Sequence, residues 1–314
     1  MSNPFNNARI APSELLTVRD WLRFAMSRFG HAGLAHGQGF LDPFDEAVYL
    51  ICHTLALPSE RLEAFLGAAL TADECRTLAW VIEQRTDERV PSAYITGEAW
   101  LGDFAFRVDR RVLIPRSFIA ELLRDDEVQP APWLVEPDAV DSVLDLCTGS
   151  GCLAVVAAHV YVNAHVDAAD ISADAIEVAA LNVADYGLET RIELLQGDLF
   201  AAVGGRRYER ILCNPPYVDA LAMSELPDEF RHEPELALAA GDDGMDFVRR
   251  ILREAPEHLE PGGWLLVEVG ERREIVEALW PDLDLTWPLT SAGDGVVFAV
   301  SEPTLAAARA AWQV

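Results

Sequence analysis

The second half of the chain alternates short apolar runs with segments of helix-like composition. From Asp141 onward the apolar runs are SVLDL, HVDAAD, RIELLQ, RILCN and WLLVEVG, with two further strand predictions in LDLTW and GVVFAV. Helices are expected between them over residues 151–160, 172–186, 244–259 and 272–280. Strands that alternate with helices build a doubly wound, mostly parallel sheet, whose ligands bind at the carboxyl ends of the strands. The sequence therefore predicts an α/β domain over residues 141–314.

The first 90 residues carry a series of helix signals instead. Ser13 is expected to cap ELLTVRDWLRFAMSRF, Asp42-Pro43 to open FDEAVYLICHTLAL, Pro58-Ser59 to start ERLEAFLGAAL, and Thr71 with Glu74 to form a capping box before CRTLAWVIEQR. These signals predict a small helical domain over residues 1–90.

Residues 91–140 are expected to link the two domains. The stretch SAYITGEAWLGDFAFRVDRRVL alternates around Gly97 and Gly102-Asp103, which indicates a β-hairpin. A short helix is predicted from Ser117 to Arg124. The acidic, proline-containing stretch DDEVQPAPWLVEPDAVD then reads as a linker.

The charge of the chain restricts its partners. The 314 residues include 52 acidic and 24 basic side chains, a net charge of −28, and every cation is arginine because the chain has no lysine. Binding of nucleic acid needs a basic surface that this composition does not supply, so no direct DNA binding is expected. A basic protein partner is favoured, although solubility or the composition of the host would also account for the acidity.

Cysteine and histidine spacing predicts neither a disulfide framework nor a metal site. The five cysteines, Cys52, Cys75, Cys147, Cys152 and Cys213, form no Cys-x-x-Cys pair, and the seven histidines form no His-Glu-x-x-His pattern. No apolar run approaches the length of a membrane span, and the start MSNPFNNARIAP lacks the features of a signal peptide. A cytoplasmic protein without membrane contact is expected, of an oligomeric state that the sequence leaves open.

The stretch VLDLCTGSGCLAV predicts a strand, a turn of small residues and the start of a helix. Free N–H groups and the positive end of the helix converge at such a turn, and a ligand can approach the backbone closely. The turn is not the dinucleotide Gly-x-Gly-x-x-Gly motif, and it is not a phosphate loop because no lysine follows Gly151. The spacing around Ser150 also excludes a serine-hydrolase elbow, whereas a purely structural turn stays open.

Two acids narrow the choice of ligand. Asp170 ends the second predicted strand, 21 residues after Gly149, where a carboxylate can accept both ribose hydroxyls of a nucleoside. Asp198 ends the third strand where an adenine edge would lie, with Leu199 and Phe200 as apolar walls. Either acid alone could be a strand-end cap. Together with the turn they indicate a nucleoside site without a pyrophosphate clamp, which fits S-adenosylmethionine, with Asp145 available for the amino group of this cofactor.

The stretch ILCNPPY ends the fourth strand with two prolines, which lack the N–H that a sheet ladder needs. With DLCTGSG, ADIS and GDLF it resembles class I S-adenosylmethionine-dependent methyltransferases that modify amide or exocyclic amino nitrogens, over about residues 141–300. The resemblance implies a Rossmann-like doubly wound sheet. It also implies a cofactor site made by Asp145, Cys147, Thr148, Gly149, Ser150, Gly151, Asp170, Asp198, Leu199 and Asn214.

The same resemblance gives the NPPY residues a catalytic role. Amide nitrogens are poor nucleophiles, and fixed acceptors for their N–H groups can turn the lone pair toward the methyl group. The Asn214 side-chain oxygen and the Pro215 carbonyl are expected to be these acceptors. Pro215 and Pro216 would stiffen the turn, and Tyr217 would pack on the planar group of the substrate. A rigid loop without chemistry is the structural alternative.

The flanking residues narrow the substrate. NPPY permits adenine in DNA, bases in RNA or glutamine in a protein. The strings VPSAYITGEAWLGDFAFRVDRRVLIPRS and LPDEFRHEPELALAAGDDGMDFVRRIL resemble the protein-glutamine methyltransferases of translation proteins. Release-factor enzymes usually read IPRP-[DE]-T-E, whereas Ile114-Pro115-Arg116-Ser117 resembles the branch that methylates large-subunit ribosomal protein three. Release-factor and DNA adenine methyltransferases, and a binding module without turnover, remain the alternatives.

The resemblance extends to three further expectations. The N-terminal helices are expected to recognise a basic ribosomal protein. Glu233 and Pro234 are expected to shape the substrate pocket, although Glu233 could be a surface acid, and Arg116 either contacts substrate or ties the hairpin to the catalytic domain. Cys147 stands where the broader family commonly has glycine, so a backbone contact to the cofactor is expected there and not a nucleophile.

Overall fold

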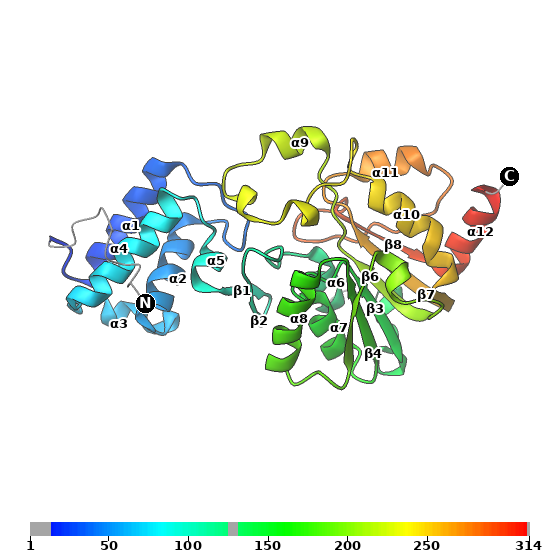
Figure 1. Ribbon diagram of the computed structural model, residues 1–314, viewed down its shortest axis with the longest axis horizontal. Helices are drawn as coiled ribbons and strands as arrows, with labels where there is room; N and C mark the ends of the chain where they lie inside the picture. Colours follow the sequence, from blue (N-terminus) through cyan, green and yellow to red (C-terminus); the bar gives the residue numbers. More distant parts are fainter. Residues whose placement is uncertain (1–13, 125–130, 313–314) are drawn as a thin grey trace. The chain divides into compact units, whose positions relative to one another are not determined.

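The computed structural model describes residues 14–124 and 131–312 (Figure 1). The chain divides into two compact units: Met1–Ala99 with Leu226–His232, and Trp100–Glu225 with Glu233–Val314. We call them the helical unit and the sheet unit. The division falls after Ala99, within the stretch expected to be a linker, and the helical unit also takes up a segment from a loop of the sheet unit. Within the described ranges, no helix has the length and apolar character needed to span a bilayer.

The helical unit contains α1 (Val18–Ala32), α2 (Pro43–Leu55), α3 (Leu62–Phe65), α4 (Ala72–Thr86) and α5 (Ser92–Thr96). Buried side chains from α1, α2 and α4, among them Trp21, Leu50 and Leu78, form its apolar core. Two predicted helix starts are confirmed. Asp42 caps α2 by accepting the N–H of Phe44, and Thr71 with Glu74 forms the capping box of α4.

Two predictions in this unit are wrong. Helix α1 starts after Thr17, which forms a capping box with Asp20, whereas Ser13 lies outside the described residues. The stretch from Ser59 is a 3₁₀ turn followed by the short α3, and not one continuous helix. The N–H of Leu70 instead donates to the carbonyl of Leu16, so the backbone beyond α3 pairs with the entry to α1.

The predicted hairpin is present, but it is shorter than expected. Strands β1 (Glu98–Leu101) and β2 (Phe104–Arg107) pair across a turn at Gly102, which has φ +60°. The residues before β1 form α5, which ends at Gly97 in the left-handed conformation that glycine favours. The expected short helix is α6 (Phe118–Arg124).

The sheet unit contains a six-stranded sheet in the order β5-β4-β3-β6-β7-β8. The strands are β3 (Ser142–Leu146), β4 (His165–Asp170), β5 (Ile192–Gln196), β6 (Tyr208–Cys213), β7 (Leu259–Glu268) and β8 (Val297–Ser301). β7 and β8 pair antiparallel, and the other pairs are parallel. The strand order reverses beside β3, so the carboxyl ends of β3 and β6 meet where doubly wound sheets bind ligands.

Helices cover both faces of this sheet (Figure 1). Side chains of α6, α7 (Cys152–Val160) and α8 (Ala173–Asp185) pack on one face. Side chains of α10 (Asp246–Glu254), α11 (Arg273–Leu279) and α12 (Glu302–Trp312) pack on the other. α12 and the short α9 (Ala220–Glu225) were not predicted. The predicted α/β class and doubly wound sheet are confirmed.

The predicted strand LDLTW is wrong. Within this stretch, Thr286 alone pairs with a strand, through an isolated bridge to Ala299 of β8. Pro281 and Pro288 flank the stretch, and because a proline lacks the N–H that a ladder uses, both limit its pairing.

Candidate active site

A cavity of about 240 Å³ lies at the carboxyl ends of β3, β4, β5 and β6. Several of the predicted site residues line it, namely Cys147, Gly149, Asp170, Asp198, Leu199, Asn214, Pro216 and Pro234. The lining also includes residues that the sequence did not single out, among them Arg111, Ile171, Leu236, Phe247 and Arg250. Strand ends far apart in sequence thus supply one cavity, as the order of the sheet requires.

The turn after β3 depends on two glycines with positive φ. Gly149 has φ +56°, and a Cβ added there would meet no protein atom within 4 Å, so its backbone faces open space. A Cβ at Gly151, with φ +80°, would come within 3.1 Å of the Ala179 Cβ, so glycine allows α7 to approach α8. The side chain of Asn182 holds the turn from α8, because its Nδ2 donates to the Ser150 carbonyl at 2.8 Å.

Cys147 begins this turn with φ +60°. A residue with a Cβ is strained in this left-handed conformation, which explains physically why glycine suits the position. Cys147 is half-buried and lines the cavity. Thr148, Ser150 and Gly151 are not among the lining residues, so the structure places them behind the turn and not on the cavity surface.

Asp170 and Asp198 lie at neighbouring strand ends in different surroundings. The two oxygens of Asp170 accept backbone N–H groups from Gly149 and Ser172, each at 2.9 Å. Burial raises the pKa of Asp170, although these N–H donors oppose the rise. Asp198 accepts instead from the Arg250 guanidinium at 2.9 Å. Asp170 is therefore fixed by backbone N–H groups of the turns, whereas Asp198 is fixed by the Arg250 side chain of α10.

Asp145 lies beneath the turn and does not line the cavity. Its side chain is fully buried, and it accepts a hydrogen bond from the Thr148 hydroxyl at 2.6 Å. Burial raises the pKa of Asp145 to about 7. The hydrogen bond ties the end of β3 to the turn, so Asp145 organises the backbone that faces the cavity. Its expected contact with the amino group of the cofactor stays a prediction.

The NPPY residues follow β6 directly. Asn214 and Pro216 line the cavity, and Pro215 is buried. Tyr217 packs against two glycines: a Cβ at Gly270 would come within 2.8 Å of the Tyr217 ring, and a Cβ at Gly244 within 2.4 Å of its carbonyl oxygen. A side chain at Gly244 would therefore displace the backbone of Tyr217, and a side chain at Gly270 would displace its ring.

Arg116 and Glu233 pair with each other. The Arg116 Nη1 lies 2.9 Å from Glu233 Oε2, and the backbone N–H of Ile114 donates to the same oxygen at 3.1 Å. Glu233 is buried, so it is not the surface acid that the sequence left open. Neither residue lines the cavity, although Pro234 does. The pair fixes the loop that carries Pro234.

Glu268 was not predicted as a site residue, because it lies in the apolar run WLLVEVG. It is 1% exposed, and its Oε2 accepts from the Ser117 hydroxyl at 2.6 Å and from the Phe118 N–H at 2.9 Å. Burial raises the pKa of Glu268 to about 7. Burial together with the charge of Glu268 also raises the pKa of Tyr217 well above its usual value. The one sequence signal for this residue is an acidic side chain inside an apolar strand. Its partner Ser117 stands at the position where release-factor enzymes usually have proline.

The sequence predicts no metal site, but the described residues contain one cluster of possible metal ligands. His165, Asp167 and Glu193 place one possible ligand atom each within 4.8 Å of one another. The cluster surrounds the start of β4, not the carboxyl end that faces the cavity. The Arg206 guanidinium already pairs with Asp167 at 2.7 Å and with Glu193 at 2.9 Å, so an arginine offsets negative charge of both carboxylates. We assign no metal to the cluster.

The cavity suits S-adenosylmethionine in the chemistry of its lining. Asp170 offers carboxylate oxygens for hydroxyl groups, and Leu199, Ile171 and Phe247 offer apolar surface for a purine ring. The open space beside Gly149 allows a ligand to lie against the backbone of the turn. The two arginines of the lining, Arg111 and Arg250, already pair with the carboxylates of Asp109 and Asp198. The residues present therefore fit a nucleoside with a charged, non-phosphate tail.

Comparison with known proteins decides the family. The chain is 53% identical over 304 residues to the ribosomal protein uL3 glutamine methyltransferase of Burkholderia pseudomallei, covering 95% of this chain and 98% of that protein. The protein of the same name from Neisseria gonorrhoeae is 52% identical, over 94% of this chain and 97% of that protein. The chain belongs to the uL3 glutamine methyltransferase family.

One further comparison, with a family model, agrees with this membership. Residues 133–241 match the family model of the methyltransferase small domain. A crystal structure of a methyltransferase from Pyrococcus furiosus is 15% identical, with a TM-score of 0.46 over 64% of this chain and 90% of that chain. As a member of the uL3 glutamine methyltransferase family, the protein is an enzyme with a class I methyltransferase fold, and its cofactor is S-adenosylmethionine.

Proposed function

We propose that the protein transfers the methyl group of S-adenosylmethionine to the side-chain amide nitrogen of a glutamine in ribosomal protein uL3. The observation that carries this proposal is the placement of Asn214 on the wall of the cavity, in a chain whose whole length matches curated uL3 glutamine methyltransferases. A ribosomal protein substrate puts the proposed reaction in the cytoplasm.

Asn214 and Pro215 are proposed to hold the substrate amide. The lone pair of an amide nitrogen is delocalised into the carbonyl, so the nitrogen attacks only when its N–H groups are held and its lone pair is turned out of conjugation. The Asn214 side-chain oxygen and the Pro215 carbonyl would accept these two N–H groups. The close packing of Tyr217 on Gly244 and Gly270 supports the proposal that these acceptors are oriented before substrate binds.

The chemistry divides between cofactor and protein. When bound, S-adenosylmethionine would supply a methyl group on a positively charged sulfur. The carbon–sulfur bond breaks as the carbon–nitrogen bond forms, the electron pair stays on the sulfur, and the methylated nitrogen then releases one proton to water. Asp170 is proposed to hold the ribose hydroxyls, and Leu199 to pack on the adenine ring. The backbone at Cys147 and Gly149 is proposed to face the amino acid part of the cofactor. The expected set also contains Asp198, Asp145, Asn214 and the turn residues Thr148, Ser150 and Gly151.

The substrate side is proposed to include surfaces beyond the cavity. The net charge of −28 supports a basic protein substrate, since opposite charges steer association. Pro216, Tyr217 and Pro234 are proposed to contact the glutamine and its neighbours. Arg116 and Glu233 are proposed to act on the pocket through their buried pair. The N-terminal helices are proposed to recognise the protein substrate.

A transfer assay with separated substrates tests this proposal. Purified protein and cofactor with a labelled methyl group are incubated with uL3, with a release factor and with DNA, and labelled peptides are mapped by mass spectrometry. We expect label on one glutamine of uL3 only. Label on a release-factor glutamine or on adenine would identify one of the alternative substrates. Binding of the cofactor without transfer to any of them would contradict the enzymatic proposal.

A further inference from the structure

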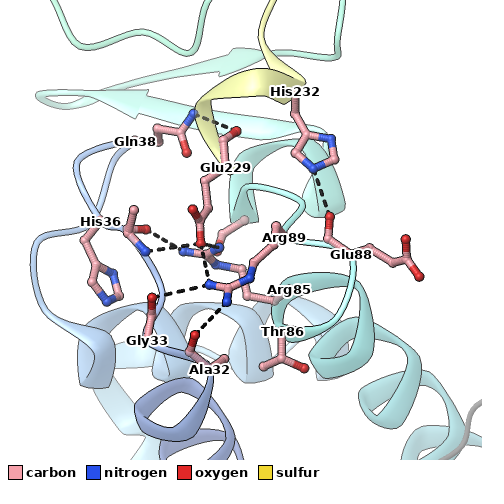
Figure 2. Close-up of polar contacts among 12 residues, drawn as sticks. Ala32, Gly33, His36, Gln38, Arg85, Thr86, Glu88, Arg89, Glu229 and His232 are labelled. Atoms are coloured by element: carbon pink, nitrogen blue, oxygen red, sulfur yellow. Dashed lines mark hydrogen bonds and ion pairs between the residues drawn. The ribbon is translucent and has the colours of Figure 1, made fainter. Parts of the chain in front are cut away.

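The loop after Tyr217 passes through the helical unit. The chain leaves the sheet unit at Glu225, packs residues 226–232 into the helical unit, and returns to the sheet unit at Glu233. We call residues 226–232 the inserted segment. Figure 2 shows Glu229 and His232 of this segment among residues of α4 and of the loop that follows α1. The inserted segment therefore belongs to the same loop as Pro234, which lines the cavity.

Glu229 holds the inserted segment by several contacts (Figure 2). Its side chain is 2% exposed, and its Oε1 accepts from the Ala35 N–H at 3.1 Å and from Arg89 Nη1 at 3.1 Å. The Arg85 Nη1 lies 3.6 Å from the same oxygen. The Gln38 side chain donates to the Glu229 carbonyl at 3.4 Å. One buried carboxylate thus binds two arginines and a backbone N–H of the helical unit.

The network around Glu229 is balanced in charge. Arg85 also donates to Glu46 at 2.7 Å, and Arg89 donates to the carbonyl of Ala32 at 2.7 Å. Two guanidinium groups therefore face two carboxylates. Burial alone would raise the pKa of Glu229, but hydrogen bonds from backbone N–H groups and Arg89, with the charge of Arg85, hold it below its usual value. Loss of the Glu229 carboxylate would leave positive charge uncompensated in a buried place.

The apolar core of the helical unit does not use the inserted segment. Among the described residues, that core and the side chains packed against it come from positions 15–95. The polar network of Glu229 joins the segment to the unit, and His232 Nε2 lies 2.9 Å from the Glu88 carbonyl oxygen. A contact of this kind anchors a loop and contributes little to the packing of the helices.

Glu233 follows Glu229 by four positions, and Arg116 and the Ile114 N–H hold Glu233 in the sheet unit. Four residues span at most about 14 Å, so the anchor at Glu229 restricts the chain that leads to Glu233 and to the lining residue Pro234. We propose that Glu229 is a positioning residue, which keeps the loop around Pro234 in the conformation that binds the protein substrate. This inference rests on the proposed function, because the substrate concerned is uL3.

The test compares Glu229→Ala with Asp228→Asn in the full-length protein. Asp228 is the matched control, because its substitution removes one negative charge from the same segment at a side chain that is 70% exposed. If the loop is in the binding-competent conformation for only a fraction of the time, the apparent affinity for substrate equals the intrinsic affinity multiplied by that fraction. We expect the KM for uL3 to rise about tenfold or more in Glu229→Ala, with kcat within about twofold. Asp228→Asn should keep the wild-type KM.

Hydrogen exchange of the protein without substrate gives a second readout. Backbone amides of residues 230–238 should exchange faster in Glu229→Ala than in the wild type and in Asp228→Asn, while amides of α7 should not change. If Glu229→Ala does not fold, Glu229→Gln, which keeps the size of the side chain, takes its place. Unchanged KM and unchanged exchange in a folded variant would overturn the proposal, as would equal effects in the control. If the wild-type protein methylates no uL3, the proposed function fails. The exchange result still shows whether Glu229 restrains residues 230–238.

Discussion

The two halves of the cavity are held in different ways. In the cofactor half, Asp170 accepts the N–H of Gly149 and of Ser172, so neighbouring turns fix one another. In the acceptor half, Tyr217 of the turn that carries Asn214 packs closely on Gly244 and Gly270, which follow it in sequence by a helix or more. The cofactor half is thus built from two short motifs, whereas the acceptor half depends on residues brought together by the whole fold.

This difference suggests how each half responds to change. A substitution in the cofactor half removes a group that is proposed to touch the cofactor, and its effect should appear as lost affinity. A substitution in the acceptor half should leave cofactor affinity unchanged and lower the rate, because it disturbs only the orientation of the substrate amide.

The largest effect is expected from Asn214→Ala. Loss of one of the two proposed acceptors should lower kcat about 100- to 1,000-fold, as removal of a single preorganised group does in other enzymes. Single-turnover transfer to uL3 at saturating cofactor measures this rate. Asn163→Ala is the control, because Asn163 is an exposed asparagine that donates to the Asp138 carbonyl at 2.8 Å. A rate within about threefold of the wild type in Asn214→Ala would break the assignment of the acceptor half.

A smaller effect, on binding, is expected from Asp170→Ala. Removal of a carboxylate that accepts hydroxyl groups costs about 1.5–3 kcal/mol, so the KM for S-adenosylmethionine should rise about 10- to 150-fold. At saturating cofactor the rate should return to within a few-fold of the wild type. Steady-state kinetics with varied cofactor measures both values. A lasting loss of rate at saturation would show that Asp170 also acts on the acceptor half.

Much of the cofactor half could be predicted from the sequence, because its residues follow the strands that position them. Gly149, Asp170 and Asp198 lie at strand ends, so the strand pattern and the order of a doubly wound sheet bring them together. Thr148, Ser150 and Gly151 share the turn but lie behind the lining, which depends on backbone angles that the residue pattern does not reveal.

The contacts of the acceptor half could not be predicted in this way. Glu268 lies in an apolar strand, and only the fold shows that Ser117 reaches it. The inserted segment was also missed, since the residues that contact Glu229 lie about 140 or more positions away along the chain. The pairing of Ser117 with Glu268 nevertheless gives a physical meaning to the IPRS string, because a proline has no hydroxyl to donate.

A moderate effect on stability is expected from Ser117→Ala. The buried Glu268 would lose its hydroxyl donor, which costs about 1–3 kcal/mol of unfolding free energy. Urea denaturation followed by circular dichroism measures this change. Ser224→Ala is the control, because the exposed Ser224 hydroxyl donates only to the nearby Leu221 carbonyl. Equal stabilities of the two variants would contradict a structural role for the Ser117 hydroxyl.

Glu268 should also give a pH dependence. Its pKa rises from 4.5 to about 7 on folding because of burial. The folded protein then binds more protons than the unfolded chain between these values, so this group lowers stability as pH rises from about 4.5 to 7. Glu268→Gln should remove this part of the dependence, and its stability curve should fall less steeply with pH than that of the wild type. Parallel curves over this window would contradict the raised pKa.

The smallest effect is expected from Cys147→Gly. Glycine relieves the left-handed strain at φ +60° but adds freedom to the unfolded chain, so the two changes offset each other to within about 1 kcal/mol. Cofactor affinity should stay within about threefold of the wild type, as expected for a backbone contact. Cys147→Val is the contrasting variant, because a β-branched residue fits this conformation poorly and should destabilise the turn. Complete loss of transfer in Cys147→Gly would contradict the assignment of Cys147 as a backbone contact.

The separation of the two halves is tested most directly by the dissociation constant of S-adenosylmethionine, measured by calorimetry for Asn214→Ala and Asp170→Ala side by side. The account predicts that Asn214→Ala binds the cofactor within about threefold of the wild type, whereas Asp170→Ala binds at least about tenfold more weakly. Equal losses of affinity in the two variants would contradict the division of the cavity into a cofactor half and an acceptor half.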